Sequence, residues 1–293
     1  MKWIIQKNLI AESQLEEILA AVQDNRINYE LVDVIPFSDT VEVRSQHLWN
    51  VPYGSTRLVT FAYENKWPGM FFNENFKTSV WRENRPDMLN ADSDILSVED
   101  ALLTYCDKSS DDMIFVRPDN DLKEFAGEVM SVSDFSTWVG QMSDGSNGNL
   151  LHEDTQIVVA PARNILAEWR WFVVGGKVVD GSMYRHRGQL VKDHETWKGV
   201  YEEAQEQADI WLPHECCVMD TALVGTDVES AEHKVIEFNN INSSGFYNHD
   251  VEKIVLAITE FVKEKENGKE ANEGDGCCKD CGYYHPQLCS EKR

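Results

Sequence analysis

Apolar and polar positions along the first third of the chain predict a strand, a helix and a second strand in succession. Apolar residues dominate 3–10 and 29–36, as expected for buried strands. Between them, the apolar residues of 11–22 recur at the spacing of one helix face, with Ser13 as the expected N-cap. Residues 57–62 are predicted to form a third strand. This order predicts a small parallel sheet.

Short apolar runs continue through the middle of the chain. Residues 98–103 have the pattern of a helix, while 114–117 and 156–161 have that of buried strands. Residues 168–180 contain two apolar runs on either side of Gly175 and Gly176, a dipeptide that favours the tight turn of a β-hairpin. We therefore expect a second region built from both helices and strands.

A last amphipathic helix is predicted over residues 250–263, and after it apolar residues almost disappear. Residues 263–276 are rich in Lys, Glu, Gly and Asn, which is typical of a solvated linker. Residues 277–293 then form a short tail that is rich in Cys.

Composition narrows the classes of function. The formal net charge is −24, which disfavours a nucleic-acid surface, because such surfaces use Lys and Arg to replace phosphate counterions. The sequence shows neither a signal peptide nor an uncharged apolar run of about twenty residues, so we expect a cytoplasmic protein without a membrane or nucleic-acid partner. Seven Cys, an odd number, do not resemble a secreted disulfide framework.

The strongest chemical signal is a pair of oxygen ligands at the end of an apolar strand that begins at Val235. Glu237 and Asn239 lie two residues apart, and alternate residues of a strand point to the same face. Asp220 ends an earlier apolar run. One or two carboxylates suit Mg²⁺, which usually completes its shell with phosphate and water. The simpler interpretation is a polar strand end in an acidic protein.

Cations on apolar strands precede these carboxylates. Arg117 ends one strand and is followed by Lys123, and Arg170 lies among aromatic residues in the first strand of the hairpin. A buried cation is costly unless it has an anionic partner. Cations followed by carboxylates are the order expected of a nucleotide site, with the cations on phosphates and the carboxylates on a metal ion.

Taken in this order, the motifs resemble the ATP-grasp superfamily, in particular the branch related to the ribosomal-protein glutamate ligase, as found in small phage and bacterial proteins. The family hairpin, acidic-x-Arg-x-Phe-Val-x-Gly, is matched by residues 168–175. The family metal motif, Glu-x-Asn followed closely by Gly, is matched by Glu237, Asn239 and Gly245. The resemblance extends over residues 110–262.

The resemblance implies an α/β protein with the ATP-grasp fold, α+β in its lid, and with ATP and Mg²⁺ as cofactors. Together with the pattern of elements and the change in composition near the end, it divides the chain into an N-terminal α/β subdomain (1–95), a lid subdomain (96–160), a C-terminal body (161–262), a linker (263–276) and a Cys/His-rich tail (277–293).

The resemblance also implies ligands for the metal and the phosphates. Asp220 occupies the place of the family's earlier metal aspartate, so Asp220, Glu237 and Asn239 would hold Mg²⁺. Arg117 stands where the family usually has lysine. This departure leaves open whether Arg117 or Lys123 binds the phosphates. The family's glycine-rich phosphate lid has no obvious match in this sequence.

Further implied contacts concern adenine and the reacting groups. Backbone groups of Val158, Val159 and Ala160 would bind adenine. Arg170 would stabilise the transferred phosphoryl group, and Arg185 would hold an acyl phosphate or a carboxylate substrate. The alternative for Arg185 is an exposed residue paired with one of the abundant acidic side chains.

The predicted function is an ATP- and Mg-dependent ligase that joins a small-molecule or peptide carboxylate to an amine through an acyl phosphate. Two alternatives stay open. One is a non-catalytic nucleotide-binding module whose tail contacts proteins. The other is a kinase that uses the same site but stops at phosphorylation.

The tail contains a candidate zinc site. Cys278 and Cys281 have C-x₂-C spacing, and His285 and Cys289 follow closely. Three thiolates and an imidazole form a recognised tetrahedral Zn²⁺ set. A segment this short cannot build a core, so the metal would supply its folding energy and could create a surface for a protein partner. The alternative is a reduced Cys-rich tail without metal.

Overall fold

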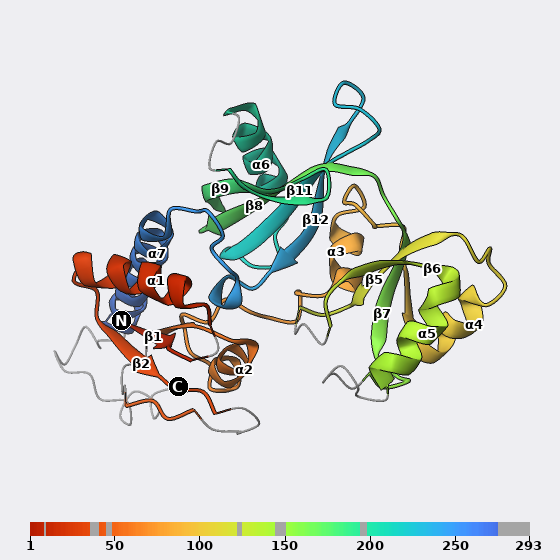
Figure 1. The fold of residues 1–293 in the computed structure, drawn as a ribbon. Coiled ribbons are helices and arrows are strands. Elements are labelled where there is room, and N and C mark those ends of the chain that lie inside the picture. Colours follow the sequence, from red (N-terminus) through yellow and green to blue (C-terminus); the bar gives the residue numbers. More distant parts are fainter. Residues whose placement is uncertain are drawn as a thin grey trace, which may run out of the picture.

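A computed structural model describes residues 1–8, 10–35, 41–44, 49–121, 125–143, 151–193 and 198–274. Three sheets follow one another along the chain, with three, four and five strands. In Figure 1 the five-stranded body sheet has the lid on one side and the N-terminal unit on the other. Lys123 and the candidate zinc ligands Cys278, Cys281, His285 and Cys289 lie outside the described residues.

The N-terminal sheet is parallel, with the strand order β2-β1-β3. Its first three elements, β1 (Lys2–Gln6), α1 (Glu12–Asp24) and β2 (Tyr29–Val32), confirm the predicted strand, helix and strand. The N-cap of α1 is Ala11, which makes no side-chain cap hydrogen bond, so the prediction of Ser13 as the cap was wrong.

The predicted third strand at residues 57–62 was also wrong. The third strand is β3 (Asn50–Tyr53), and the predicted segment lies in helix α2 (Thr56–Glu64). The buried residues of α2 are Leu58, Val59 and Ala62. Residues four apart lie on one face of a helix, so this spacing satisfies a helical period as well as a strand-like run of apolar residues.

The lid is an antiparallel sheet of order β4-β7-β5-β6. Helices α4 (Val98–Tyr105) and α5 (Val132–Ser143) pack on one face of it, against strand residues such as Val116 and Val159. Because side chains alternate along a strand, Arg117 lies on the opposite face. The lid strands are β4 (Asp94–Ser97), β5 (Met113–Pro118), β6 (Glu128–Ser131) and β7 (Gln156–Pro161).

The body is an antiparallel sheet of order β10-β9-β8-β11-β12. Its central hairpin turns at Gly175 and Gly176, as predicted, and both have positive φ, at 60° and 74°. Such φ values are those of the tight hairpin turn that glycine favours. The body strands are β8 (Ile165–Val174), β9 (Lys177–His186), β10 (Gln189–Asp193), β11 (Cys217–Val224) and β12 (Glu232–Asn239).

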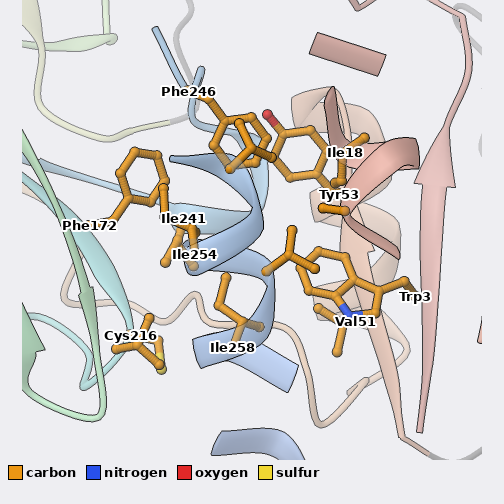
Figure 2. Close-up of a cluster of buried hydrophobic side chains, with 14 of the residues drawn as sticks. Trp3, Ile18, Val51, Tyr53, Phe172, Cys216, Ile241, Phe246, Ile254 and Ile258 are labelled. Atoms are coloured by element: carbon orange, nitrogen blue, oxygen red, sulfur yellow. The ribbon is translucent and has the colours of Figure 1, made fainter. Parts of the chain in front are cut away.

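The two faces of the body sheet have different partners. Trp169 and Trp171 of β8 join a core with α6 (Lys198–Ile210) and with Trp81 of α3 (Thr78–Asn84). Phe172, on the other face, joins the core of the N-terminal unit, together with Ile254 and Ile258 of the last helix (Figure 2). The N-terminal unit and the body therefore share one hydrophobic core.

The last helix, α7 (Val251–Gly274), follows the short helix η1 (Ile241–Ser243) and extends beyond the predicted end near residue 263. Residues 263–274, expected to be a linker, are helical in the structure. Lys and Glu have good helix propensity. A prediction that uses only the spacing of apolar residues does not take this propensity into account. Lys265 also pairs with Glu215 at 2.9 Å and thereby ties this part of α7 to the body. Within the described residues, no helix is long and apolar enough to cross a membrane.

We expect Gly181→Ala to destabilise the protein by about 1–3 kcal/mol, because it overpacks a filled core. A Cβ atom at Gly181 would lie 2.1 Å from the buried ring of Trp171. Gly140, in the interior of α5, is the matched control, since a Cβ atom there meets nothing within 4 Å. Gly140→Ala should stabilise the helix by about 0.5–1 kcal/mol. Urea unfolding of both variants measures the difference, and equal effects would contradict this packing.

Candidate active site

Neighbouring body strands bring the three predicted metal ligands together. Asp220 of β11 and Glu237 of β12 are register partners. The Asn239 amide nitrogen donates to both carboxylates, over 3.2 Å to Asp220 and 3.1 Å to Glu237. The side chains of Asp220, Glu237 and Asn239 therefore form one hydrogen-bonded cluster, which we call the carboxylate cluster.

Arg170 of β8 binds the carboxylate cluster from the other side of β11. It is the register partner of Asp220, and its Nε and Nη2 atoms donate to the two carboxylate oxygens over 2.9 and 2.6 Å. The two side chains are only 8% and 1% exposed. The anionic partner that a buried cation at position 170 requires is therefore Asp220.

Arg117 reaches the carboxylate cluster from the lid. Its Nη1 atom donates to Glu237 Oε2 over 2.5 Å, and its guanidinium group lies 5.2 Å from the centre of a Trp81 ring. This ion pair joins β5 of the lid to β12 of the body. It places a cation beside the carboxylates.

The two carboxyl groups have opposite pKa shifts. Burial raises the pKa of Asp220 to about 6, and Glu237 adds to the rise while Arg170 opposes it. Although burial also acts on Glu237, Arg117 and the hydrogen bond from Asn239 hold its pKa below the usual 4.5. Neighbouring carboxyl groups with separated pKa values are common at functional sites.

The chemistry of the carboxylate cluster suits a divalent cation. Two carboxylates in a buried setting repel each other, and a cation relieves that repulsion. If the side-chain amide group of Asn239 rotates by half a turn, its oxygen takes the place of its nitrogen. Asp220, Glu237 and Asn239 then all present oxygen atoms, the ligands that Mg²⁺ prefers. Among the described residues, no group of three or more His, Cys, Asp or Glu could hold a metal. The candidate site therefore depends on an amide as its third ligand.

Two cavities border the carboxylate cluster at the junction of lid and body. One, of about 530 Å³, is lined by lid residues such as Phe115 and Gly127 and by Arg170, Asp220 and Glu237 of the body. The second, of about 340 Å³, is lined by Arg117, Glu237 and Asn239 among others. Molecules bound in the two cavities would meet at Glu237.

The predicted adenine contacts lie farther from these cavities. Val158 and Val159 of β7 pair with β4 on one side and β5 on the other, and Ala160 pairs with Phe115 of β5 beyond the end of β4. None of the three is among the residues that line the two cavities. Pro161, the next residue, does line the larger cavity.

Arg185 of β9 lines the larger cavity and lies near an acidic side chain. Its Nη1 atom is 3.4 Å from Glu168 Oε1, and the side chain is 43% exposed. Its Nε atom is buried and finds no hydrogen-bond partner among the described residues. Arg185 thus lies at the site and can still turn donors toward a bound molecule.

Two aromatic residues of the larger cavity, Tyr184 and Tyr247, were not among the predicted site residues. Their rings stack with centroids 5.4 Å apart, and the Arg170 guanidinium group lies 4.8 Å from the Tyr247 ring. A signal was available, because Tyr247 follows the predicted metal motif closely and Tyr184 directly precedes Arg185. Nothing local, however, indicated that the two rings meet.

The sequence also matches a known family model. Residues 97–257, more than half of the chain, match the ATP-grasp domain, R2K clade family 2. Among curated proteins, none matches this chain.

Solved structures resemble the fold over most of the chain. D-cycloserine synthetase DcsG has a TM-score of 0.60 at 11% identity, over 89% of this chain and 100% of that one. The RimK domain ATP-grasp protein of Sphaerobacter thermophilus has a TM-score of 0.55 at 11% sequence identity, over 90% of this chain and 100% of that one. D-alanine–D-alanine ligase of Bacillus anthracis, complexed with ATP, has a TM-score of 0.53 at 10% sequence identity, over 92% of this chain and 99% of that one. At such identities, the likeness establishes the shared fold alone.

We expect the Asp220 carboxyl group to titrate near pH 6, well above its ordinary 3.8. The folded protein then holds this proton more tightly than the unfolded chain does. The stabilisation from Asp220 is therefore complete below pH 3.8 and is lost as the pH rises through about 6. Carboxyl NMR of isotope-labelled protein, with Asp220→Asn to assign the resonance, measures the midpoint. A midpoint at or below the ordinary value would contradict this expectation and mean that Arg170 fully offsets or outweighs burial.

Proposed function

Because the chain belongs to the ATP-grasp domain family, R2K clade family 2, we propose that it is a ligase that joins a carboxylate to an amine with ATP. The observation that carries the proposal is the convergence of Arg117, Arg170 and the carboxylate cluster at the junction of lid and body. A substrate carboxylate oxygen would attack the γ-phosphorus, and ADP would leave. The amine nitrogen would then attack the acyl carbon, losing a proton as phosphate departs.

The carboxylate cluster would hold Mg²⁺ through Asp220, Glu237 and Asn239. Bound Mg²⁺ would neutralise charge on the phosphates during transfer. Arg170 supports this assignment, because its two hydrogen bonds fix the orientation of the Asp220 carboxylate. Arg117 supports it as well, since it holds Glu237 from the lid side.

Cations at the junction would bind the phosphates and the reacting carboxylate. Arg117 and Lys123 would bind phosphate oxygens; Asp121 and Phe125, on either side of Lys123 in the sequence, both line the smaller cavity. Arg170 would stabilise the transferred phosphoryl group, and Arg185 would hold the substrate carboxylate or acyl phosphate. Fixed cations of this kind act mainly by positioning the reactants and neutralising charge.

Adenine would bind along the end of β7. Backbone groups of Val158, Val159 and Ala160 are the proposed contacts, and Ala160 is the best placed, because it lies beyond the last register partner of β4. The substrates would be a small-molecule or peptide carboxylate and an amine.

We expect ATP with Mg²⁺ to raise the melting temperature, because a ligand that binds only the folded state stabilises it, by about 2.7 kcal/mol at a hundredfold excess over Kd. Glu237→Gln should lose most of the Mg²⁺-dependent part of this shift, since it removes one charged ligand. Glu260→Gln, on the exposed side of α7, is the matched control and should behave as the wild type does. Thermal melting with and without Mg²⁺ measures both.

Turnover then separates the ligase from its alternatives. In a single turnover, ADP should already form with the carboxylate alone, and a C–N-bonded product and free phosphate that form only when the amine is also present support the ligase. A stable phosphorylated product without an amine would identify a kinase, and ATP binding without hydrolysis would identify a binding module. No melting shift with millimolar ATP or GTP would contradict a nucleotide site.

The tail would bind zinc. We expect one zinc ion per chain through Cys278, Cys281, His285 and Cys289, with an affinity that falls at lower pH because thiolates must lose their protons to bind. Because α7 contacts the body through Lys265, the informative truncation ends at Gly274. Metal analysis of the full and truncated chains, purified without chelator, tests this prediction. Equal zinc in both would place the metal elsewhere, and zinc in neither would favour a metal-free tail.

A further inference from the structure

We propose that the stacked rings of Tyr184 and Tyr247 bind the amine substrate in its protonated, cationic form, which releases one proton to solvent before its nitrogen attacks the acyl carbon. The identity of the ligand as a substrate rests on the proposed ligase function. The location and the charge preference rest on the two rings and their surroundings.

The two rings form one wall of the larger cavity. They are nearly parallel, with an interplanar angle of 11° and centroids 5.4 Å apart. The Tyr184 hydroxyl donates to Glu168 Oε2 over 2.7 Å, which fixes its ring from β8. The Arg170 guanidinium group lies 4.8 Å from the Tyr247 ring and 5.8 Å from the Tyr184 ring. A molecule on this wall would therefore lie in the same cavity as Arg170 and Asp220.

Tyr247 is held in place at a conformational cost. Its φ of 47° lies in the left-handed region, which a bulky residue rarely adopts. The preceding residue, Phe246, is buried and stacks on Tyr53 at 4.9 Å and on Phe172 at 5.6 Å. The Tyr53 hydroxyl donates to the backbone of Ser244 over 3.0 Å. The core thus anchors the loop while the Tyr247 ring remains 56% exposed.

Such an arrangement suits a binding residue better than a packing residue. A tyrosine that served only the core would be buried in a relaxed backbone conformation. Here the strained backbone turns the ring toward the cavity, where its outer part is accessible to a ligand. Strained residues of this kind gather at ligand-binding positions.

The faces of the two rings favour a cation. The face of an aromatic ring attracts ammonium groups and repels carboxylates. Three acidic side chains, Glu168, Asp220 and Glu237, and three arginines line the same cavity. Each of these arginines pairs with a carboxylate: Arg163 with Asp92, Arg170 with Asp220 and Arg185 with Glu168. The net charge of −24 also raises the local concentration of cations around the whole molecule.

The test uses three probes of one size that differ in charge: n-butylammonium, n-butanol and butyrate. Saturation-transfer NMR without nucleotide should find the tightest binding for n-butylammonium. Tyr247→Ala should weaken that binding about two- to fivefold, the range expected when a cation loses an aromatic face. Tyr63→Ala removes a partly exposed tyrosine of α2, which packs edge to face on Phe72 away from the cavity, and should leave binding unchanged.

Additional variants keep the test decisive. Tyr247→Phe retains the ring and should bind as the wild type does. Tyr247→Asn, whose residue type tolerates positive φ, and Tyr184→Leu should both weaken binding and serve if Tyr247→Ala does not fold. Equal or tighter binding of n-butanol would overturn the inference, as would butyrate binding that the ring-deleting variants weaken, or n-butylammonium binding that all of these variants leave unchanged. Because no nucleotide is present, a failure of ATP to bind would count against the proposed function but not against this cation site.

Discussion

The buried ion pair between Arg170 and Asp220 is the interaction on which the rest of the site depends. Removing either charge from water is costly, and the cost is offset only by close, well-directed hydrogen bonds to the other. The two bonds of this pair fix the Asp220 carboxylate, and strand pairing sets Glu237 beside it. Asn239 and Arg117 then complete a network in which each buried charge has a partner.

One face of the body sheet serves both the core and the site. Phe172 and Val174 of β8 pack into the core shared with the N-terminal unit and α7. Glu168 and Arg170, on the same face because strand side chains alternate, line the cavity toward the lid. The rigidity of the core therefore extends along the strands to the charged groups. The lid adds Arg117 from a separate sheet, so the complete site requires both sheets.

The spacing of apolar residues predicted an element correctly where it fitted only the helical or only the strand period. It failed where the same residues fitted both periods. The strands that carry Arg117 and Arg170 were predicted, as was the hairpin turn, whereas Asp220, expected at the end of an apolar run, lies inside β11. The run at residues 57–62 fitted a strand and a helix equally well, and burial of Leu58 against the N-terminal sheet and of Ala62 beside Met70 selected the helix. The second half of α7 is almost free of apolar residues, so a search for apolar stripes ended that helix too early.

The sequence by itself determined that a carboxylate and an amide share a strand face, because the period of two at Glu237 and Asn239 is a local property. It also determined that a cation at position 170 needs an anionic partner. Only the tertiary structure decided which partner that is, which carboxylate Arg117 reaches, and that Tyr184 meets Tyr247. These contacts join residues distant in sequence, 50 positions apart for Arg170 and 120 for Arg117. They follow from strand register and from the packing of separate sheets, which no local pattern encodes.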